Sequence, residues 1–215
     1  MDIMTIMEQR HSVRQYKDVR IESEKLNELR AMAEDINRRT GLHIQLCCDE
    51  PKCFDSFMAH YGKFTGVKNY IALVGKKSVS LEEQLGYYGE QLVLRAQELG
   101  LNTCWVAMTH GKSSAEVKKG EKLGCIISLG YGENVGVPHS SKPMEELCKA
   151  DEMPEWFKNG MKGAMLAPTA MNQQKFKIEL LPSGEVRATC GKGFYTKLDL
   201  GIVKYHFEAA SGRKI

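Results

Sequence analysis

The segment Ala167-Pro168-Thr169-Ala170-Met171-Asn172-Gln173-Gln174 joins two stretches of different periodicity. The run from Trp156 to Leu166 is apolar and has the spacing of a helix, whereas Phe176–Leu180 alternates between apolar and polar residues as a strand does. Pro168 ends the helix, because the residue before a proline is pushed out of the helical region. The sequence therefore predicts a helix, an extended loop and a strand in this order.

The loop itself carries hydroxyl and carboxamide groups and little bulk. Asn and Gln each offer a pair of donors and an acceptor, which suits hydrogen bonding to the edge of a planar heterocycle. A polar turn between a helix and a strand explains the same residues, and a single loop pattern does not separate the two interpretations.

A second segment, Arg10-His11-Ser12-Val13-Arg14, lies just past a predicted helix end. Arg10, Ser12 and Arg14 occupy alternate positions, and alternate side chains of an extended segment share a face. Two guanidinium groups and a hydroxyl on one face form a good phosphate site, because Arg binds phosphate through a bidentate fork. A basic turn on a solvated surface is the alternative, and the loop at 167–174 favours the phosphate site.

Together the two segments resemble the FMN-dependent nitroreductase family. Its members open with a helix that ends in Arg-Arg/His-Ser-x-Arg/Lys, and they carry an Ala-Pro-Ser/Thr-x-x-Asn-x-Gln loop. The resemblance extends through Tyr87-Tyr88-Gly89 and Val106 to Gly130-Tyr131-Gly132, so it covers most of the chain. In the usual member the Asn/Gln loop precedes the middle of the chain. Here it lies near the C-terminus, an order similar to that of the divergent TM-type nitroreductase branch.

The resemblance implies an α+β fold with three layers, α/β/α, around a mainly antiparallel sheet. A faint repeat of helix, loop, strand, loop and helix occurs at 23–99 and again at 154–210, aligned on Gly89 and Gly201. Family members are typically homodimers whose Asn/Gln loop comes from the partner chain. We therefore hypothesise an internal pseudo-two-fold, although chance recurrence of a common helix–strand unit explains the repeat equally well.

On this hypothesis the chain has two halves that together form one compact flavin-binding unit. Residues 1–150 are the nitroreductase-like core half with the phosphate-binding motif. Residues 151–215 are an abridged partner copy that carries the Asn/Gln loop. The chain would then be a pseudo-dimeric monomer, with a homodimer as the other arrangement that the resemblance implies.

The cofactor that the resemblance implies is FMN. Arg10, Ser12 and Arg14 would bind its phosphate and ribityl chain. His11 would contact the flavin through its backbone or its ring, and a structural histidine is the rival interpretation. Lys142, which precedes a proline, resembles a basic position after the last core strand of family members and could add a second phosphate contact.

The isoalloxazine ring is expected to lie against the polar loop. Asn172 and Gln174 are the candidates for contacts with the ribityl chain and the ring edge. Pro168, Thr169 and Ala170 would line the ring through backbone and van der Waals contacts.

The segment Trp105-Val106-Ala107-Met108 follows a predicted strand, where family members place backbone amides near the flavin N5. A donor at this point stabilises negative charge on the reduced ring. Met108 is bulkier than the small or acidic residues of many relatives, and Trp105 is equally explained as a core aromatic. No catalytic side chain is predicted, because flavin hydride chemistry requires no acid or base of fixed identity.

Periodicity and capping signals predict the remaining elements. The helices start at Asp2 and Ser23, the second ends at Gly41, and a polar connection spans 145–151. A loop with Pro51, Gly62 and Gly66 follows the first strand. The predicted strands are 43–47, 70–74, 101–106, 125–129 and a hairpin of 178–181 with 186–190, and the other helices are 85–99, one from Pro154 and 196–210.

Composition excludes several classes of partner. The 215 residues are 42% hydrophobic, and a net charge of +3 with dispersed Lys and Arg is too mild to indicate a nucleic-acid partner. The seven cysteines are odd in number, and neither they nor the histidines follow metal-ligand spacing, which predicts reduced thiols in the cytoplasm and no metal. The acidic and basic first turns are no signal peptide, and no apolar run reaches the ~18 residues that would cross a membrane.

The function that the resemblance implies is that of an FMN-dependent NAD(P)H oxidoreductase. NAD(P)H and a small aromatic acceptor, a nitroaromatic or a quinone, would use the same open pocket in turn by ping-pong hydride transfer. A flavin enzyme of narrow substrate range on the same fold is one alternative. A flavin-binding or flavin-sensing protein without turnover is another.

Overall fold

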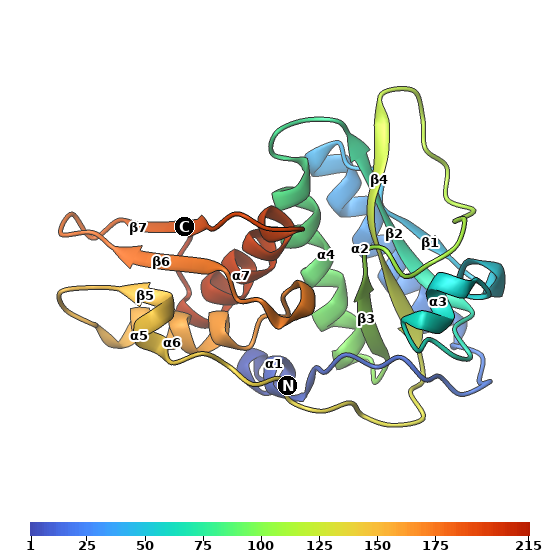
Figure 1. Ribbon diagram of the computed structural model, residues 1–215, viewed down its shortest axis with the longest axis horizontal. Coiled ribbons are helices and arrows are strands. Elements are labelled where there is room, and N and C mark those ends of the chain that lie inside the picture. Colours follow the sequence, from blue (N-terminus) through green and yellow to red (C-terminus); the bar gives the residue numbers. More distant parts are fainter. The chain divides into compact units, whose positions relative to one another are not determined.

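The computed structural model describes all 215 residues and divides them into two compact units (Figure 1). Unit 1 contains Met1–Gln9, Glu82–Gln91 and Pro138–Ile215. Unit 2 contains Arg10–Leu81 and Leu92–Val137. The chain thus enters unit 1 for the last time at Pro138.

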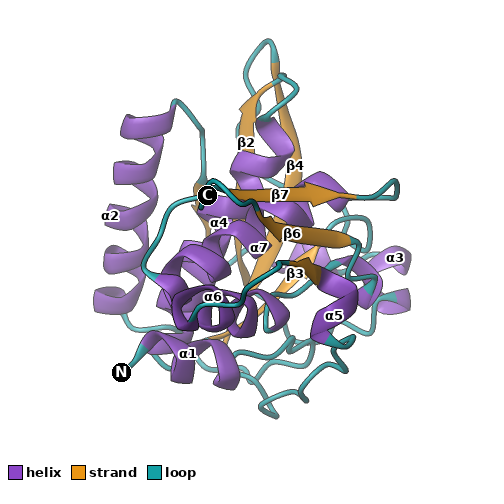
Figure 2. Ribbon diagram, turned by 90° about the vertical axis from the view of Figure 1, so that its left-hand side faces the viewer, coloured by secondary structure: helices purple, strands orange, loops and turns teal.

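Unit 2 contains a four-stranded sheet whose neighbouring strands are all antiparallel. Its order is β1-β2-β4-β3, with the bounds β1 (Gln45–Cys47), β2 (Asn69–Lys76), β4 (Glu121–Gly130) and β3 (Asn102–Val106). Three of its strands, β2, β3 and β4, are labelled among the orange arrows of Figure 2. The expected mainly antiparallel sheet of an α+β fold is confirmed.

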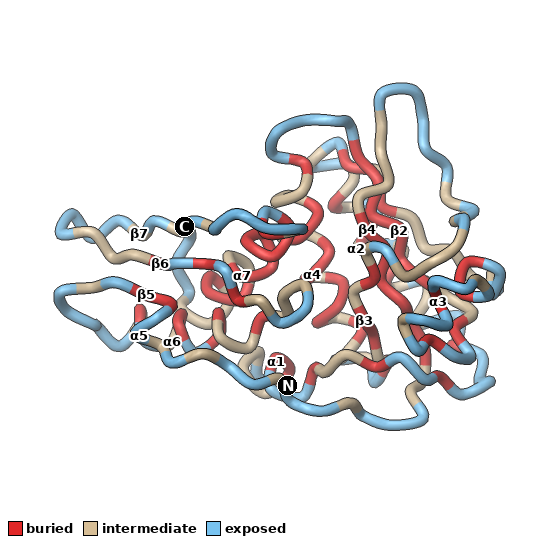
Figure 3. Tube along the Cα trace, viewed as in Figure 1, coloured by how far each residue is buried: buried red, intermediate tan, exposed pale blue.

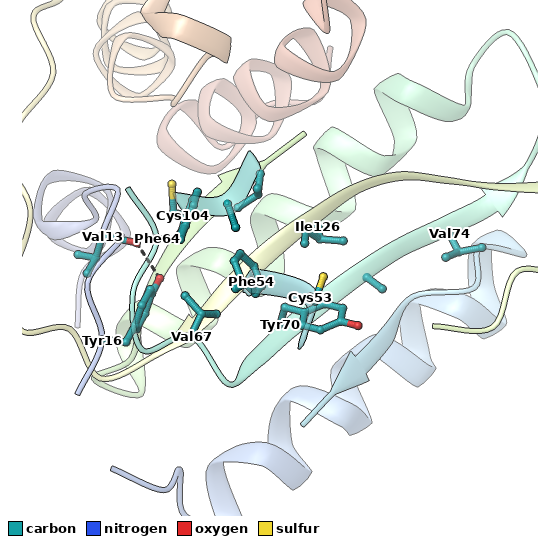
Figure 4. Close-up of a cluster of buried hydrophobic side chains, with 13 residues drawn as sticks. Val13, Tyr16, Cys53, Phe54, Phe64, Val67, Tyr70, Val74, Cys104 and Ile126 are labelled. Atoms are coloured by element: carbon teal, nitrogen blue, oxygen red, sulfur yellow. Dashed lines mark hydrogen bonds between the residues drawn. The ribbon is translucent and has the colours of Figure 1, made fainter. Parts of the chain in front are cut away.

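The two strands at the centre of this sheet, β2 and β4, contain its longest runs of buried residues (Figure 3). All residues from Tyr70 to Gly75 are buried in β2, as their continuous apolar run predicts. A β-bulge between Leu73 and Val74 shifts the register against β4. One face of the sheet packs on a buried cluster to which Val13, Phe54, Phe64 and Cys104 belong (Figure 4).

The long helix of unit 2 is α2 (Ser23–Thr40), which buries Leu29, Ala33 and Ile36. It ends at Gly41, whose φ of 73° is the left-handed conformation typical of a helix C-cap. The prediction that Ser23 caps this helix is wrong. Ser23 is the first helical residue, and Glu22 occupies the N-cap without a side-chain hydrogen bond.

Two stretches expected to be irregular contain short elements. The chain after β1 forms a 3₁₀ turn η1 (Pro51–Phe54) and the helix α3 (Phe57–Tyr61), which Ser56 caps by accepting from the Ala59 N–H. The expected polar connection at 145–151 forms α5 (Met144–Leu147) and β5 (Cys148–Lys149). Both of these predictions missed short elements that sit on a few buried residues.

Unit 1 combines helices with a three-stranded sheet of order β5-β6-β7. The β6–β7 pair is the predicted antiparallel hairpin, and β5 pairs with β6 in parallel. The bounds of its further elements are α1 (Ile3–Gln9), α6 (Glu155–Met165), η2 (Ala170–Asn172), β6 (Phe176–Leu180), β7 (Val186–Cys190) and α7 (Thr196–Ser211).

Glycines let the helices of unit 1 approach closely. A Cβ atom at Gly160 of α6 would lie 2.5 Å from the Phe207 ring, and one at Gly201 of α7 would lie 1.9 Å from the Glu83 carbonyl oxygen. Glu83 belongs to α4 (Leu81–Glu98), which begins before the predicted Leu85 and runs from unit 1 into unit 2. These contacts require hydrogen in place of a side chain.

No helix of the chain combines the length and the apolar character needed to cross a membrane. All seven cysteines are free thiols. The structure contains no group of three or more His, Cys, Asp and Glu residues that could hold a metal ion.

Candidate functional site

The predicted phosphate motif runs beside β3 in unit 2. Ser12 forms a parallel bridge with Thr103, and the N–H of Val13 donates to the Thr103 carbonyl oxygen over 3.0 Å. The motif is therefore extended, as the alternation of its residues predicts, and it lies along the strand that leads into Trp105.

Cys104 of β3 is a common neighbour of the three predicted phosphate ligands. Burial raises the pKa of its thiol, while the charges of Arg14 and Arg10 and a hydrogen bond from Ser12 act to lower it. Arg10 is 4% exposed and Arg14 lies at the surface. The charges of Arg10 and Arg14 and the Ser12 hydroxyl thus all act on this thiol, which is 1% exposed and belongs to the core.

The side chain of Tyr16 anchors the backbone of the motif at Val13 (Figure 4). Its buried hydroxyl donates to the Val13 carbonyl oxygen over 2.8 Å and lies 2.8 Å from the Ser128 Oγ atom. Burial holds the pKa of Tyr16 far above its usual value, so the phenol stays neutral and keeps its proton for this contact. The Tyr16 carbonyl oxygen lies where a Cβ atom of Gly66 would be, so only glycine allows this approach.

His11 is half-buried, and the chain at Gly136 packs on it. Gly136 has a φ of 72°, and a Cβ atom there would lie 2.7 Å from the His11 Cβ and 2.9 Å from the Ser12 carbonyl oxygen. The segment that ends unit 2 thus covers the motif at these two residues.

The predicted ring-edge segment starts on β3 and leaves the sheet. Trp105 and Val106 pair with Ile127 and Ile126 of β4, and Val106 is fully buried. Ala107 is half-buried and Met108 is 63% exposed beyond the strand. The structure thus brings this segment, which starts on β3, beside Ser12 and Val13 of the motif, which pair with Thr103 of the same strand.

The polar loop of unit 1 has a strained backbone. Met171, Asn172 and Gln174 adopt φ values of 53°, 52° and 46°, in the left-handed region that residues with a Cβ atom rarely occupy. Each such residue costs about 1–3 kcal/mol and persists only where its surroundings hold it. The loop therefore needs anchors, and its side chains supply them.

Gln174 is the first anchor, with 4% of its surface exposed. Its Oε1 atom accepts from the Lys142 N–H over 2.8 Å, and its Nε2 atom donates to the Ser140 carbonyl oxygen over 2.9 Å and to the Asn172 Oδ1 atom over 3.0 Å. The structure thus places Lys142 beside the loop. It also uses the Gln174 carboxamide to hold residues 140–142 against it.

Asn172 lies at the surface of the loop. Its Nδ2 atom donates to the Ser140 carbonyl oxygen over 2.8 Å, and its Oδ1 atom accepts from Gln174. A carboxamide has two N–H donors and two acceptor lone pairs, so one of each remains for a further partner. Pro168, Thr169 and Ala170 are half-buried at the start of the same loop.

The second anchor, Asp199, is a residue that the sequence analysis missed. Its Oδ1 atom accepts from the Ala170 N–H over 2.9 Å and its Oδ2 atom accepts from the Gln173 Nε2 over 2.8 Å. Burial raises its pKa to about 6, although both hydrogen bonds act to lower it. The available signal was a carboxylate inside the apolar run Leu198–Val203 of the last helix.

The predicted site residues therefore form two groups. The group in unit 2 consists of Arg10, His11, Ser12, Arg14, Trp105, Val106, Ala107 and Met108, and the group in unit 1 consists of Lys142, Pro168, Thr169, Ala170, Asn172 and Gln174. The first offers cationic and hydroxyl donors, which suit a phosphate. The second offers an exposed carboxamide on a fixed backbone, which suits a polar ring edge.

Comparison with known proteins gives a family. A family model described as "Putative TM nitroreductase" matches residues 2–211. No curated protein matches the chain.

Solved structures with the nitroreductase fold are similar to this chain. A "putative nitroreductase" from Thermotoga maritima has a TM-score of 0.69 and 23% identity, with 98% of this chain and 83% of that chain covered. A "putative nitroreductase" from Desulfovibrio desulfuricans in complex with FMN has a TM-score of 0.54 and 16% identity, with 67% and 93% covered. A "Putative NADH dehydrogenase/NAD(P)H nitroreductase" from Bacteroides thetaiotaomicron has a TM-score of 0.53 and 18% identity, with 67% and 95% covered.

These likenesses show the fold, and they confirm the expected nitroreductase-like α+β architecture. The family model spans almost the whole chain, and it agrees with the resemblance that the Arg10–Arg14 and Ala167–Gln174 motifs carry. The chain belongs to the Putative TM nitroreductase family.

Proposed function

We propose that this chain is an FMN-dependent oxidoreductase that oxidises NAD(P)H and reduces nitroaromatic or quinone acceptors. Membership of a nitroreductase family supports the oxidoreductase class, and a structure of similar fold from Desulfovibrio desulfuricans is a complex with FMN. The observation that carries the proposal is the strained loop at 170–174, which internal hydrogen bonds hold while Asn172 stays exposed. A plain turn between a helix and a strand would need neither the strain nor the anchors.

The donor set of unit 2 fits the phosphate and ribityl chain of FMN. Arg14 is exposed and Ser12 is half-buried beside β3, so a phosphate there would meet a guanidinium group and a hydroxyl, in addition to the charge of the buried Arg10. His11 is assigned a backbone or ring contact with the flavin. Lys142 in unit 1 is assigned the second phosphate contact.

The loop of unit 1 is assigned to the isoalloxazine ring. Asn172 would use its remaining N–H and lone pair on the polar edge of the ring. Pro168, Thr169 and Ala170 would line the ring face, and Gln174 supports Asn172 through the 3.0 Å hydrogen bond between their carboxamides.

Backbone donors at the end of β3 are assigned to the flavin N5 region. Ala107 and Met108 leave the sheet after Val106, where their N–H groups are no longer committed to the strand pairing with β4. Trp105 would pack near the ring from the strand itself. A fixed donor in this place stabilises negative charge that develops on a reduced ring.

When bound, FMN supplies the redox chemistry, in which a hydride comes from NAD(P)H and leaves to a nitroaromatic or quinone acceptor in a second half-reaction. The residues of the chain bind and orient the cofactor, and no side chain is assigned as an acid or base. We further propose a cytoplasmic protein in which residues 1–150 and 151–215 act as two halves of one flavin-binding unit. A pseudo-dimeric monomer and a homodimer are the two arrangements to separate by its mass in solution.

The test is the visible spectrum of the purified full chain, followed by titration with FMN and by NAD(P)H oxidation in the presence of nitrofurazone or menadione. We expect a yellow protein that binds FMN and oxidises NAD(P)H at a rate that depends on the acceptor. Asn172→Ala should weaken FMN binding about tenfold or more, the equivalent of one good hydrogen bond. The matched variant Asn27→Ala, at an exposed position of α2, should bind FMN like the wild type.

Two outcomes would contradict the proposal. A protein that stays colourless after addition of FMN would remove the cofactor. A protein that binds FMN tightly but oxidises no NAD(P)H with either acceptor would instead be a flavin-binding protein without turnover.

A further inference from the structure

The Asp199 carboxylate accepts its hydrogen bonds from the polar loop. One oxygen accepts from the Ala170 N–H and the other from the Gln173 side chain, at 2.9 and 2.8 Å. The Gln173 amide also donates to the Phe194 carbonyl oxygen over 2.9 Å, which fixes its orientation. Asp199 is 4% exposed, and the hydrogen bonds of its carboxylate are these two from the loop.

The loop that Asp199 holds is the strained one. Ala170 and Gln173 flank Met171 and Asn172, the two consecutive residues with φ near +50°. Because the Asp199 carboxylate accepts hydrogen bonds from both sides of these residues, it fixes the direction in which Asn172 points. Gln174, on the other side of the loop, holds Asn172 by its carboxamide.

A buried carboxylate is a poor choice for stability alone. Burial raises the pKa of Asp199 to about 6, which means that keeping the group ionised at neutral pH works against folding. A neutral side chain of similar shape would avoid that cost. The Asp199 carboxylate instead gives the loop two charged acceptors, and hydrogen bonds to an ionised group are stronger than those between neutral groups.

We propose that Asp199 is a positioning residue for the cofactor loop, and that its ionised carboxylate sets the orientation of Asn172 by holding Ala170 and Gln173. The identity of the ligand, FMN, rests on the proposed function, whereas the role of Asp199 in holding the loop rests on the structure alone. It predicts that removing the charge weakens cofactor binding without unfolding the protein.

The first test compares Asp199→Asn with the wild type and with Asp151→Asn, a control at an exposed carboxylate of unit 1. Asn has one carbonyl oxygen, so it can accept from one of the two donors and turns its own NH₂ toward the other. We expect about tenfold weaker FMN binding at pH 7.5. We expect the melting temperature of the apoprotein to stay within about 4 °C of the wild type or to rise.

A second variant removes the partner on the loop. Gln173→Ala should weaken FMN binding to a similar degree, and the double variant Asp199→Asn/Gln173→Ala should be no weaker than either single variant. Additive losses would show that the two residues act separately and would overturn the proposal. Unchanged FMN affinity in Asp199→Asn would overturn it as well, as would the loss of near-ultraviolet circular dichroism in that variant.

Hydrogen exchange of the apoprotein separates this inference from the proposed function. We expect faster exchange in the peptide that covers residues 167–176 in Asp199→Asn, and no change there in Asp151→Asn. If the wild type fails to bind FMN, this measurement still decides whether Asp199 holds the loop. Equal exchange in all three proteins would refute that role even if FMN binds.

Discussion

The Nε2 atom of His206 lies 2.9 Å from the Oε1 atom of Glu90, and both side chains are completely buried in unit 1. The Nδ1 atom of His206 lies 3.0 Å from the Gly163 carbonyl oxygen, which can only accept, so Nδ1 carries a proton. The contact between Nε2 and the carboxylate therefore holds a second proton. This pair ties α4, α6 and α7 together inside the unit.

His206→Ala should lower the free energy of unfolding by about 3–5 kcal/mol, because it removes a hydrogen-bond partner of the completely buried Glu90 carboxylate. Urea denaturation followed by circular dichroism measures the change. His60→Ala is the matched control, since His60 lies at the surface 3.8 Å from Asp55 and such a pair contributes about 0–1 kcal/mol. Equal effects of the two substitutions would be inconsistent with a structural role of the buried pair.

Asp199 should give the stability of the protein a distinct pH dependence. Its pKa rises from 3.8 to about 6 on folding, so the folded state holds more protons than the unfolded state between these values. The free energy of unfolding should therefore fall as the pH rises through this window, by about 3 kcal/mol from this group. Asp199→Asn should lack this component, whereas Asp151→Asn should retain it in urea titrations between pH 4 and pH 7.5. A wild type that becomes more stable relative to Asp199→Asn as the pH rises would have the opposite sign and would disprove the assignment.

Arg14→Gln should weaken binding of FMN much more than binding of riboflavin. The lost contact is to the phosphate in our proposal, and a hydrogen bond between charged groups contributes about 1.5–3 kcal/mol, or about 10- to 100-fold in Kd. Flavin fluorescence titrations with both ligands measure the ratio. Arg38→Gln, at an exposed arginine of α2, serves as the control. Equal losses for FMN and riboflavin would place Arg14 away from the phosphate.

Gly201→Ala should be strongly destabilising although alanine is the better helix former. The added Cβ atom would lie 1.9 Å from the Glu83 carbonyl oxygen and 2.7 Å from the Tyr87 nitrogen, and this backbone cannot move aside without separating α4 from α7. We expect a loss of about 3 kcal/mol or more in thermal or urea unfolding. At Gly191 the nearest atom would be 3.8 Å away, so Gly191→Ala should remain within about 0.5 kcal/mol of the wild type. Tolerance of alanine at Gly201 would mean that the two helices do not approach as described.

Local signals in the sequence predict the elements that depend on local physics. Pro168 marks the end of α6 within three residues, and the apolar run at Tyr70–Val74 identifies the central strand β2. The hairpin of β6 and β7 follows from its alternation and from the turn at Gly184, whose φ is 84°. In each case a chain of a few residues contains the information.

Contacts between residues that lie far apart in the sequence could not be predicted from local patterns. The strand β5 has two residues and exists only because Cys148 and Lys149 pair with β6, some 30 positions further on. The same limit applies to the site. Alternation indicates that Arg10, Ser12 and Arg14 act together. No local pattern, however, shows that Asp199 accepts a hydrogen bond from Ala170 or that Gln174 accepts one from Lys142.

The carboxamide of Gln174 holds the irregular stretch from Ser140 to Lys142 at both of its ends, although Gln174 lies 32 positions from Lys142 along the chain. Hydrolysis of that amide to an acid would exchange one nitrogen for an oxygen and leave the shape almost intact. It would nevertheless turn a donor into an acceptor facing the Ser140 carbonyl and the Asn172 side chain. Chemical ageing at this one atom would thus weaken the attachment of both stretches of chain at once.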